Sequence, residues 1–285
     1  MLDDAFRDMG DGVYIQSRQS AVLFNVAHFR AKTTTIRIVM KQLLFADDSA
    51  LVAHYADEMH KIVDAFSDAS KKFGLKINIE KSEVLYQPNS TRTREEDIMV
   101  DVNKLKYVLV LSYLGSTMSS NGCIDDEIQR RMAKASTSYG RLRQRLWNNH
   151  HVSMRVKGKI HRVIVLSTLL YTAEAWTVYI RQVETLHDFM VRYLRSIMWI
   201  TWMDKVTNKD ILERTGLPYM EDLLLRKRFQ WTGHLMRMPP DRLPKRIPYS
   251  QLLVTETEGA LVSRKDQLKD ISLTQQRDKW RAIVK

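Results

Sequence analysis

The sequence predicts an α+β protein, in which short strands and one helix come first and a mostly helical region follows. Three observations support this class. Residues 75–85 alternate between apolar and polar side chains, as in a strand with one buried face. Residues 125–146 repeat their apolar side chains every three or four positions, which is typical of an amphipathic helix. The chain of 285 residues has only 10 Gly and 6 Pro, which favours helices over a turn-rich β protein.

Residues 35–54 predict a β-hairpin. Apolar residues 43–45 lead into a polar dipeptide, Asp47-Asp48, and apolar residues 50–53 lead out of it. A polar pair between two runs of strand-forming residues is the usual pattern of a tight turn. We therefore expect both carboxylates at the tip of the hairpin.

A helix, a strand and a second hairpin are expected next. Apolar side chains at three- and four-residue spacing predict a helix over residues 56–73, and Gly74 can end it in a left-handed conformation. The alternating residues 75–85 follow as a strand. A hairpin over residues 98–111, with Asn103 in its turn, completes the part of the chain that contains strands.

Helices are expected after Gly122. Residues 125–146 have an apolar stripe on one face and four basic side chains on the opposite face, which are Arg130, Lys134, Arg141 and Arg145. Further helices are expected over residues 155–179, 183–198, 208–214 and 220–238. Four tryptophans of this region are expected in its core, namely Trp176, Trp199, Trp202 and Trp231. From Pro239 onward, weak periodicity predicts a partly disordered tail.

The basic charge of the chain lies in its second part. Residues 1–112 hold 15 Lys+Arg and 16 Asp+Glu, a net charge of −1, whereas residues 113–285 hold the remaining 30 basic and 17 acidic side chains, a net charge of +13. A field of this sign attracts polyanions, nucleic acid first and anionic membranes second. The same charge also suits a solvated surface that only aids solubility, and both interpretations stay open.

Composition excludes several classes of protein. The single cysteine, Cys123, excludes an internal disulfide framework and a zinc finger built on cysteines. The histidines His150, His151, His161 and His234 do not have the spacing of a zinc site. No apolar run is long enough to cross a bilayer, so we expect no membrane partner.

The adjacent carboxylates of Asp47 and Asp48 favour a metal site. Two like charges side by side repel each other, and a divalent cation removes that penalty. Mg²⁺ prefers hard oxygen ligands such as carboxylates, and two ions held in this way can clamp the attacking and leaving oxygens of a phosphoryl transfer. The alternative is a plain surface turn, because Asp is a favoured turn residue.

The residues around this pair resemble motif C of reverse transcriptases, especially those of non-LTR (LINE-type) retrotransposons. Residues 43–53 read LLFADDSALVA. Residues 73–82, FGLKINIEKS, resemble motif D, and residues 112–116, SYLGS, resemble motif E, the primer-grip hairpin. Later segments resemble the C-terminal half of the family, namely residues 125–147, 166–176, 195–198 and 228–238. The ordered series covers nearly the whole chain.

The resemblance implies a catalytic role for three residues. Asp47 and Asp48 would bind Mg²⁺ (or Mn²⁺) for two-metal nucleotidyl transfer, with Asp47 the more direct ligand. Lys81 would be the lysine of motif D, close to the incoming triphosphate, where it protonates or neutralises the pyrophosphate. An ordinary surface lysine explains Lys81 equally well.

The resemblance also implies residues that hold the nucleic acid. Tyr113, Leu114 and Gly115 would shape the loop that presses the primer terminus toward the metals, although a strand that enters a turn explains them equally well. The basic face of residues 125–146 would contact the phosphates of the template–primer duplex. A solvated face on a packed helical bundle is the alternative for its four basic side chains.

A domain organisation follows from the same resemblance. Residues 1–116 would be part of a polymerase palm with motifs C, D and E. Residues 117–205 would be a helical thumb, and residues 206–285 a basic helical C-terminal region with the partly disordered tail. The implied partners are an RNA template, a DNA primer, deoxynucleoside triphosphates and the N-terminal polymerase and endonuclease portion of the element.

One part of the family pattern is not found in the sequence. Motif A, which supplies a further metal-binding aspartate, and motif B lie well upstream of motif C in the family, and only 46 residues precede Asp47. We therefore expect an RNA-directed DNA polymerase fragment that is inactive alone. A non-enzymatic RNA- or DNA-binding protein derived from such an element and the product of a decayed element are the alternatives.

Overall fold

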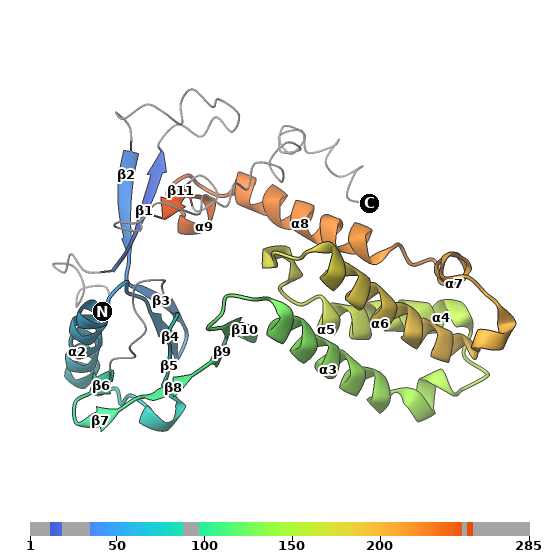
Figure 1. The fold of residues 1–285 in the computed structure, drawn as a ribbon, viewed down its shortest axis with the longest axis horizontal. Coiled ribbons are helices and arrows are strands. Elements are labelled where there is room, and N and C mark those ends of the chain that lie inside the picture. The colour runs from blue at the N-terminus through green and yellow to red at the C-terminus, as the bar shows by residue number, and fades with distance from the viewer. Residues whose placement is uncertain (1–11, 19–34, 88–96, 247–249, 253–285) are drawn as a thin grey trace. The chain divides into compact units, whose positions relative to one another are not determined.

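The computed structural model describes residues 12–18, 35–87, 97–246 and 250–252. Helices and short strands are mixed in it, as the coarse α+β class requires (Figure 1). The described residues fall into two compact units. The first unit holds the described residues up to Leu114 and from Thr232 onward, and the second, which we call the helical unit, is Gly115–Trp231. The sequence alone predicted three domains, with boundaries after residue 116 and after residue 205.

Most strands of the first unit pair in twos. A three-stranded antiparallel sheet has the order β11-β1-β2, in which Val13 pairs with Met40. Its strands are β1 (Val13–Arg18), β2 (Thr35–Met40) and β11 (Ser250–Leu252). The hairpin predicted around the aspartate pair is confirmed, and its strands are β3 (Gln42–Phe45) and β4 (Asp48–Leu51).

Helix α2 (Ala56–Lys72) agrees closely with the prediction. Gly74 follows it with a φ of 69°, a left-handed conformation that favours glycine. Its N–H donates to Lys71 O at 3.0 Å, and the N–H of Leu75 donates to Ser70 O at 2.8 Å. These two hydrogen bonds form a Schellman motif, which satisfies carbonyl groups that the end of a helix leaves unpaired.

The predicted strand over residues 75–85 is wrong for most of its length. Residues Ile79–Lys81 form a 3-10 turn, and only β5 (Glu83–Leu85) is a strand. The side chain of Asn78 explains the difference, because its Oδ1 accepts a hydrogen bond from the backbone N–H of Lys81 at 3.2 Å. A local bond of this kind offers the backbone an alternative to a strand ladder.

The second hairpin has its turn two residues earlier than predicted. Its strands are β6 (Met99–Val100) and β7 (Asn103–Lys104), so Asn103 lies in a strand and not in the turn. Asp101 has a φ of 53°, and its carboxylate accepts hydrogen bonds from Ser67 at 3.1 Å and Lys71 at 2.6 Å on α2. These two bonds hold the turn at this position.

The remaining elements of the first unit are short. Strand β8 (Lys106–Val108) pairs with β5 in parallel, and β9 (Val110–Tyr113) follows it. Among the described residues of the unit, a small core cluster contains Val63, Ile98, Val100 and Leu105. Within the region predicted as a partly disordered tail, the structure describes α9 (Leu243–Arg246) as well as β11. The later residues of that prediction lie outside the described ranges.

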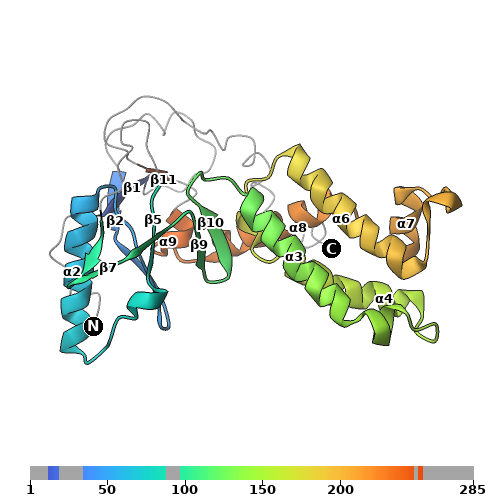
Figure 2. The same cartoon turned by 60° about the horizontal axis from the view of Figure 1, so that its bottom comes forward.

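The helical unit has a single large core. After β10 (Ser116–Ser119) come α3 (Asp125–Arg141), α4 (Met154–Ile160), α5 (Ser167–Leu169), α6 (Ile180–Met198) and α7 (Asn208–Thr215). Helix α8 (Met220–Arg237) crosses the division between the units. Figure 2 shows α3 and α6 as the long helices of the unit. Leu186, Met190 and Leu194 of α6 have no exposed surface. The helices predicted over residues 183–198, 208–214 and 220–238 are confirmed.

Two of the predicted helices are interrupted. The helix expected over residues 125–146 ends as an α-helix at Arg141, and a π-helical turn, Arg143–Trp147, follows. The indole N–H of Trp147 donates to Tyr139 O at 2.9 Å, which helps to hold this wider turn. The segment over residues 155–179 is α4, a π-helical turn, α5 and a 3-10 turn, and it breaks at Thr172, whose φ is 63°.

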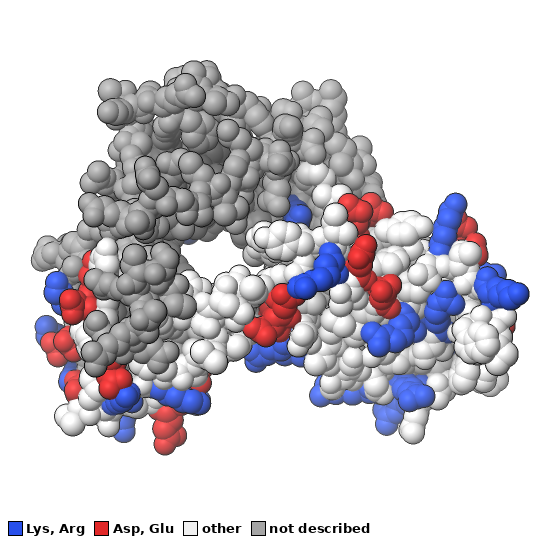
Figure 3. All heavy atoms as spheres, viewed as in Figure 1, with Lys and Arg blue, Asp and Glu red and all other residues white. Residues whose placement is uncertain are grey.

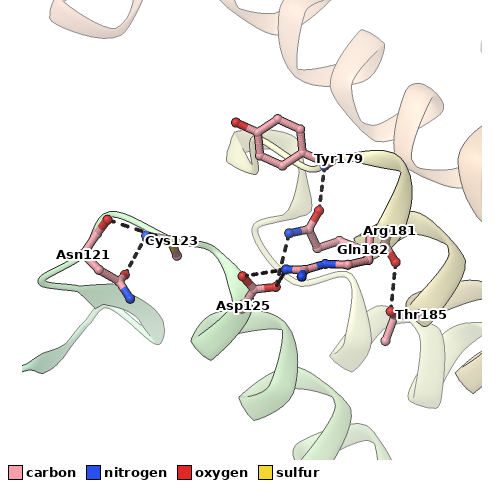
Figure 4. A network of polar contacts seen from close by, with 7 residues as sticks. All are labelled: Asn121, Cys123, Asp125, Tyr179, Arg181, Gln182 and Thr185. Atoms are coloured by element: carbon pink, nitrogen blue, oxygen red, sulfur yellow. Dashed lines mark hydrogen bonds and ion pairs between the residues drawn. The ribbon is translucent and has the colours of Figure 1, made fainter.

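A polar network connects the starts of α3 and α6 (Figure 4). Arg181 donates to both carboxylate oxygens of Asp125, at 3.1 and 3.2 Å, and the amide of Gln182 donates to Asp125 Oδ1 at 3.2 Å. The side chain of Gln182 also accepts a hydrogen bond from the backbone N–H of Tyr179 at 2.9 Å. The network fixes where α6 begins relative to α3.

Candidate nucleic-acid interface and carboxylate pair

The carboxylate pair lies on a two-residue turn. Residues Ala46 and Asp47 form the turn between β3 and β4, and Asp48 is the first residue of β4, paired with Phe45. Asp47 alone is therefore at the tip, whereas the prediction placed both aspartates there. Ala46 has a φ of 50°, in the region that favours glycine at the first position of such turns. Both carboxylates are exposed.

The strand that leads to the pair is exposed as well. Leu43, Leu44 and Phe45 keep 38%, 42% and 64% of their surface accessible. These apolar residues of β3 are thus at the surface of the first unit. A run of exposed apolar side chains beside two carboxylates is unusual for a plain surface turn.

The pair offers suitable ligand atoms for Mg²⁺ but only part of a two-ion site. Two carboxylates with additional water are a common way to hold one such ion. Among the described residues, no group of three or more Asp, Glu, His or Cys side chains is arranged to hold a metal. Asp47 and Asp48 therefore do not by themselves fit a two-ion centre, and no chemical step through a metal follows from them.

Tyr113 lies close to the carboxylate pair. Its hydroxyl donates to Leu43 O of β3 at 3.0 Å, which attaches the end of β9 to the hairpin. Burial raises the pKa of Tyr113, and the negative charge of Asp48 raises it further. The structure thus brings together residues from the segments that resemble motifs C and E. Lys81 is exposed in its 3-10 turn, and the described contacts include none between it and either aspartate.

The other two primer-grip candidates form the turn that follows β9. Leu114 and Gly115 have φ values of 47° and 82°. The guanidinium of Arg131 on α3 donates to Gly115 O, and it lies 4.5 Å above the ring of Tyr171. A Cβ atom at position 115 would lie 3.5 Å from that ring. That distance is an ordinary contact, so it is the positive φ of the backbone that favours glycine here.

A buried ion pair supports this turn. Arg131 and Glu127 are 4% and 2% exposed, and Arg131 Nε donates to Glu127 Oε1 at 2.7 Å. The second oxygen of Glu127 accepts the backbone N–H of Thr117 at 2.9 Å. Both charges are thus satisfied by several hydrogen bonds, as burial demands. The sequence analysis missed this pair, although its spacing of four residues on a helix was a usable signal.

The four basic residues predicted to bind nucleic acid are exposed. Arg130 donates to Thr117 Oγ1 at 3.0 Å, so it also holds β10. Lys134 and Arg141 lie on α3, away from its buried residues. Arg145 lies in the π-helical turn and therefore does not continue the helical face of the other three, as the prediction assumed.

These residues belong to a longer segment that has no acidic side chain. Residues 128–173, which we call the basic segment, contain 10 Lys+Arg and no Asp or Glu. Arg131 and Lys157 are buried, and Lys157 donates to Trp147 O at 2.8 Å. The other eight are exposed, namely Arg130, Lys134, Arg141, Arg143, Arg145, Arg155, Lys159 and Arg162.

The basic segment presents unneutralised charge. None of the eight exposed side chains takes part in an ion pair within the described residues. Figure 3 shows Lys and Arg side chains along the lower margin of the helical unit, with the acidic side chains higher on that face. A charge census of short windows would have found this segment from the sequence.

Three tryptophans expected in the core are at the surface. Trp176 is buried as predicted, at 5% exposed, but Trp199, Trp202 and Trp231 are 59%, 84% and 39% exposed. The buried indole that the prediction left out is Trp147, at 1% exposed, which stacks on Tyr139. Trp199 and Trp202 lie in the turn between α6 and α7, where the polypeptide leaves the helix and its apolar face ends.

We call residues 199–205 the aromatic loop. Its 3-10 turn, Trp202–Asp204, is closed by the carboxylate of Asp204, which accepts hydrogen bonds from the backbone N–H of Thr201 at 2.6 Å and from its hydroxyl at 2.9 Å. These bonds lower the pKa of Asp204. Met203 of this loop is 69% exposed, and the ring of His150 stacks on Trp199 at 5.9 Å between centroids.

A cavity of about 310 Å³ lies where α3 and α6 begin. Its lining includes Asp125 and Arg181, which are paired with each other. Because the charges of the cavity already satisfy one another, we assign it no ligand.

Comparisons with protein-family models, with curated proteins and with solved structures gave no match. A search of the described helices for a segment both long and apolar enough to span a bilayer found none.

Proposed function

We propose that this chain is part of an RNA-directed DNA polymerase of the non-LTR retrotransposon type, in which the helical unit binds the nucleic acid. The observation that carries the proposal is the basic segment, with eight exposed basic side chains and no acidic residue over residues 128–173. Neutralisation of phosphates by such side chains supplies most of the affinity of a protein for a duplex.

The polymerase part of the proposal rests on the resemblance of the sequence and on two structural facts that support it. Asp47 and Asp48 stand exposed on a tight hairpin, and Tyr113 from the segment like motif E donates to that hairpin. In this proposal, the first unit corresponds to the later part of a palm and the helical unit to a thumb. Mg²⁺ would supply the electrostatic stabilisation of phosphoryl transfer, with a further carboxylate beyond the described residues.

A binding measurement tests the nucleic-acid part. We expect the chain to bind an RNA–DNA duplex, and Arg141→Gln with Arg145→Gln to weaken binding and to reduce the salt dependence of log K by about one per charge removed. The matched control is Lys72→Gln with Lys76→Gln, which removes the same charge from exposed positions of the first unit. Equal effects of both pairs in fluorescence anisotropy would contradict a local interface.

A primer-extension assay tests the catalytic part. We expect the chain alone to bind the template–primer but not to extend it with Mg²⁺ or Mn²⁺, because the described residues provide only two of the required carboxylates. Clear extension by the isolated chain would show that this expectation is wrong.

The non-enzymatic alternative is a binding protein derived from such an element. Two observations favour this alternative: the basic segment has eight exposed basic side chains, and the carboxylate pair provides only part of a metal site. Mn²⁺ binding, followed by electron paramagnetic resonance, separates the two functions. The polymerase proposal expects ion binding that Asp47→Asn with Asp48→Asn abolishes. Duplex binding without any ion binding at the pair would favour the alternative.

A further inference from the structure

The aromatic loop holds Trp199, Trp202 and Met203 out of the core, whereas its Ile200 packs against the core. Trp199 and Lys205, at its two ends, have φ values of 58° and 49°, which L side chains adopt at an energetic cost. The carboxylate of Asp204 closes the turn between them. Arg195 of α6 then donates to Val206 O at 2.8 Å, just beyond the loop. A strained and braced turn of this kind holds a fixed conformation.

The side chains held in this way are large and apolar. Trp202 is 84% exposed and has no ring contact within the described residues, whereas Trp147 and Trp176 of the same unit are 1% and 5% exposed. An indole presented on a rigid turn offers a flat face at small cost in conformational entropy. The loop is therefore suited to stack on another flat group.

Its surroundings indicate what that group is. His150, which stacks on Trp199, belongs to the basic segment, so one residue of that segment contacts the aromatic loop directly. Within the helical unit, α4 also approaches α7 closely, since a Cβ atom on Gly158 would lie 3.3 Å from Thr215 O. The nearby acidic groups Asp204 and Asp210 are both held in hydrogen bonds to threonines.

We propose that the aromatic loop stacks on an unpaired nucleobase of a single-stranded segment, with Trp202 as the stacking residue and the basic segment holding the phosphates. The occupant is a single strand because bases inside a duplex stack on each other and hide their faces. Every base has a π-face, so this contact is tolerant of sequence. The inference rests on the proposed nucleic-acid binding and adds a second, strand-specific contact to it.

Binding of a labelled single-stranded oligonucleotide to the full chain, measured by anisotropy, tests the inference. We expect Trp202→Ala to weaken binding roughly tenfold, in the range usual for a lost base–aromatic stack, and Trp202→Phe to retain most of the affinity. Binding of an RNA–DNA duplex, and of an abasic strand of equal length, should not change. The matched control is Tyr179→Ala, which removes another exposed ring, 71% accessible, at the opposite end of α6.

The outcomes separate this inference from the proposed function. If Trp202→Ala and Tyr179→Ala bind the single strand equally well, or if Trp202→Ala weakens the abasic strand as much as the natural one, the stacking site is overturned and a protein contact becomes the better use of the loop. If Arg141→Gln with Arg145→Gln has no effect on the duplex, the proposed function fails instead. An unchanged melting temperature of Trp202→Ala confirms that the variant is folded.

Discussion

The two units of this protein use their apolar residues in opposite ways. The described part of the first unit has a small core and leaves Leu43, Leu44 and Phe45 of its hairpin accessible. The helical unit has a continuous core and buries even charged groups, including Glu127 and Arg131. The hairpin with the recognisable sequence motif thus belongs to the unit with the smaller core. The basic segment belongs to the unit with the larger core. A motif that is recognised in the sequence does not show that the other residues of its site are present.

The largest expected effect concerns the buried ion pair of the helical unit. Arg131→Met leaves Glu127 charged and buried, so the free energy of unfolding should fall by about 3–5 kcal/mol. The double variant Arg131→Met with Glu127→Leu should recover a large part of this loss, because it leaves no unpaired charge. Urea denaturation followed by circular dichroism measures both. A single variant as stable as the original protein would show that the pair does not hold the unit together.

A matched pair of leucines compares the two units directly. Leu194→Ala, in the core of α6, should cost about 2–5 kcal/mol, since Leu194 has no exposed surface and the truncation leaves a cavity. Leu44→Ala in β3, which is 42% exposed, should change stability by less than about 0.5 kcal/mol. Similar losses in thermal denaturation would mean that β3 is covered in solution.

A histidine of the helical unit should give it an acid sensitivity. His161 is fully buried, neither ring nitrogen has a hydrogen-bond partner among the described residues, and burial lowers its pKa from 6.5 to about 4. The unfolded chain therefore takes up a proton below about pH 6.5, while the folded chain does so only near pH 4. The free energy of unfolding is therefore undiminished above pH 6.5, and it falls by up to roughly 3 kcal/mol as the pH drops toward 4.

Replacement of the histidine checks this dependence. His161→Leu keeps an apolar side chain of similar size and should remove the slope between pH 6.5 and 4 in denaturation curves. The same slope in the variant would assign the acid sensitivity to other groups.

The parts of the fold that local sequence determines were predictable. Helix α2, with Gly74 at its end, and helix α7 both follow an apolar period in the sequence, and both are found as expected. The hairpin of the aspartate pair was also found, because two apolar runs around a polar dipeptide leave few alternatives.

The errors arise where a side chain binds the backbone or another element. Asn78 converts an alternating segment into a 3-10 turn, and Asp101 takes the turn because Ser67 and Lys71 reach its carboxylate. Trp147 donates an indole hydrogen bond to Tyr139 O where the predicted long helix gives way to a π-helical turn. Such contacts depend on tertiary structure, so residue propensity and period do not show them.

The candidate interface was predictable only in part. Arg130, Lys134 and Arg141 were placed correctly at the surface because helical periodicity assigns faces. The exposure of Trp199 and Trp202 was not predicted, because large hydrophobic side chains are normally buried. The hydrogen bonds of the aromatic loop hold these two at the surface instead.

The hydrogen bond from Arg131 to the turn has a consequence for sequence change. Because Arg131 binds the carbonyl oxygen of Gly115, it recognises the course of the main chain and not the identity of a neighbouring side chain. This hydrogen bond therefore does not restrict the side chain of Leu114, which is 40% exposed, and only its φ of 47° disfavours β-branched residues there. The length of the turn is restricted, because one inserted or deleted residue would move the oxygen away from the guanidinium. Tolerance of substitution together with intolerance of insertion is the evolutionary signature that this contact predicts.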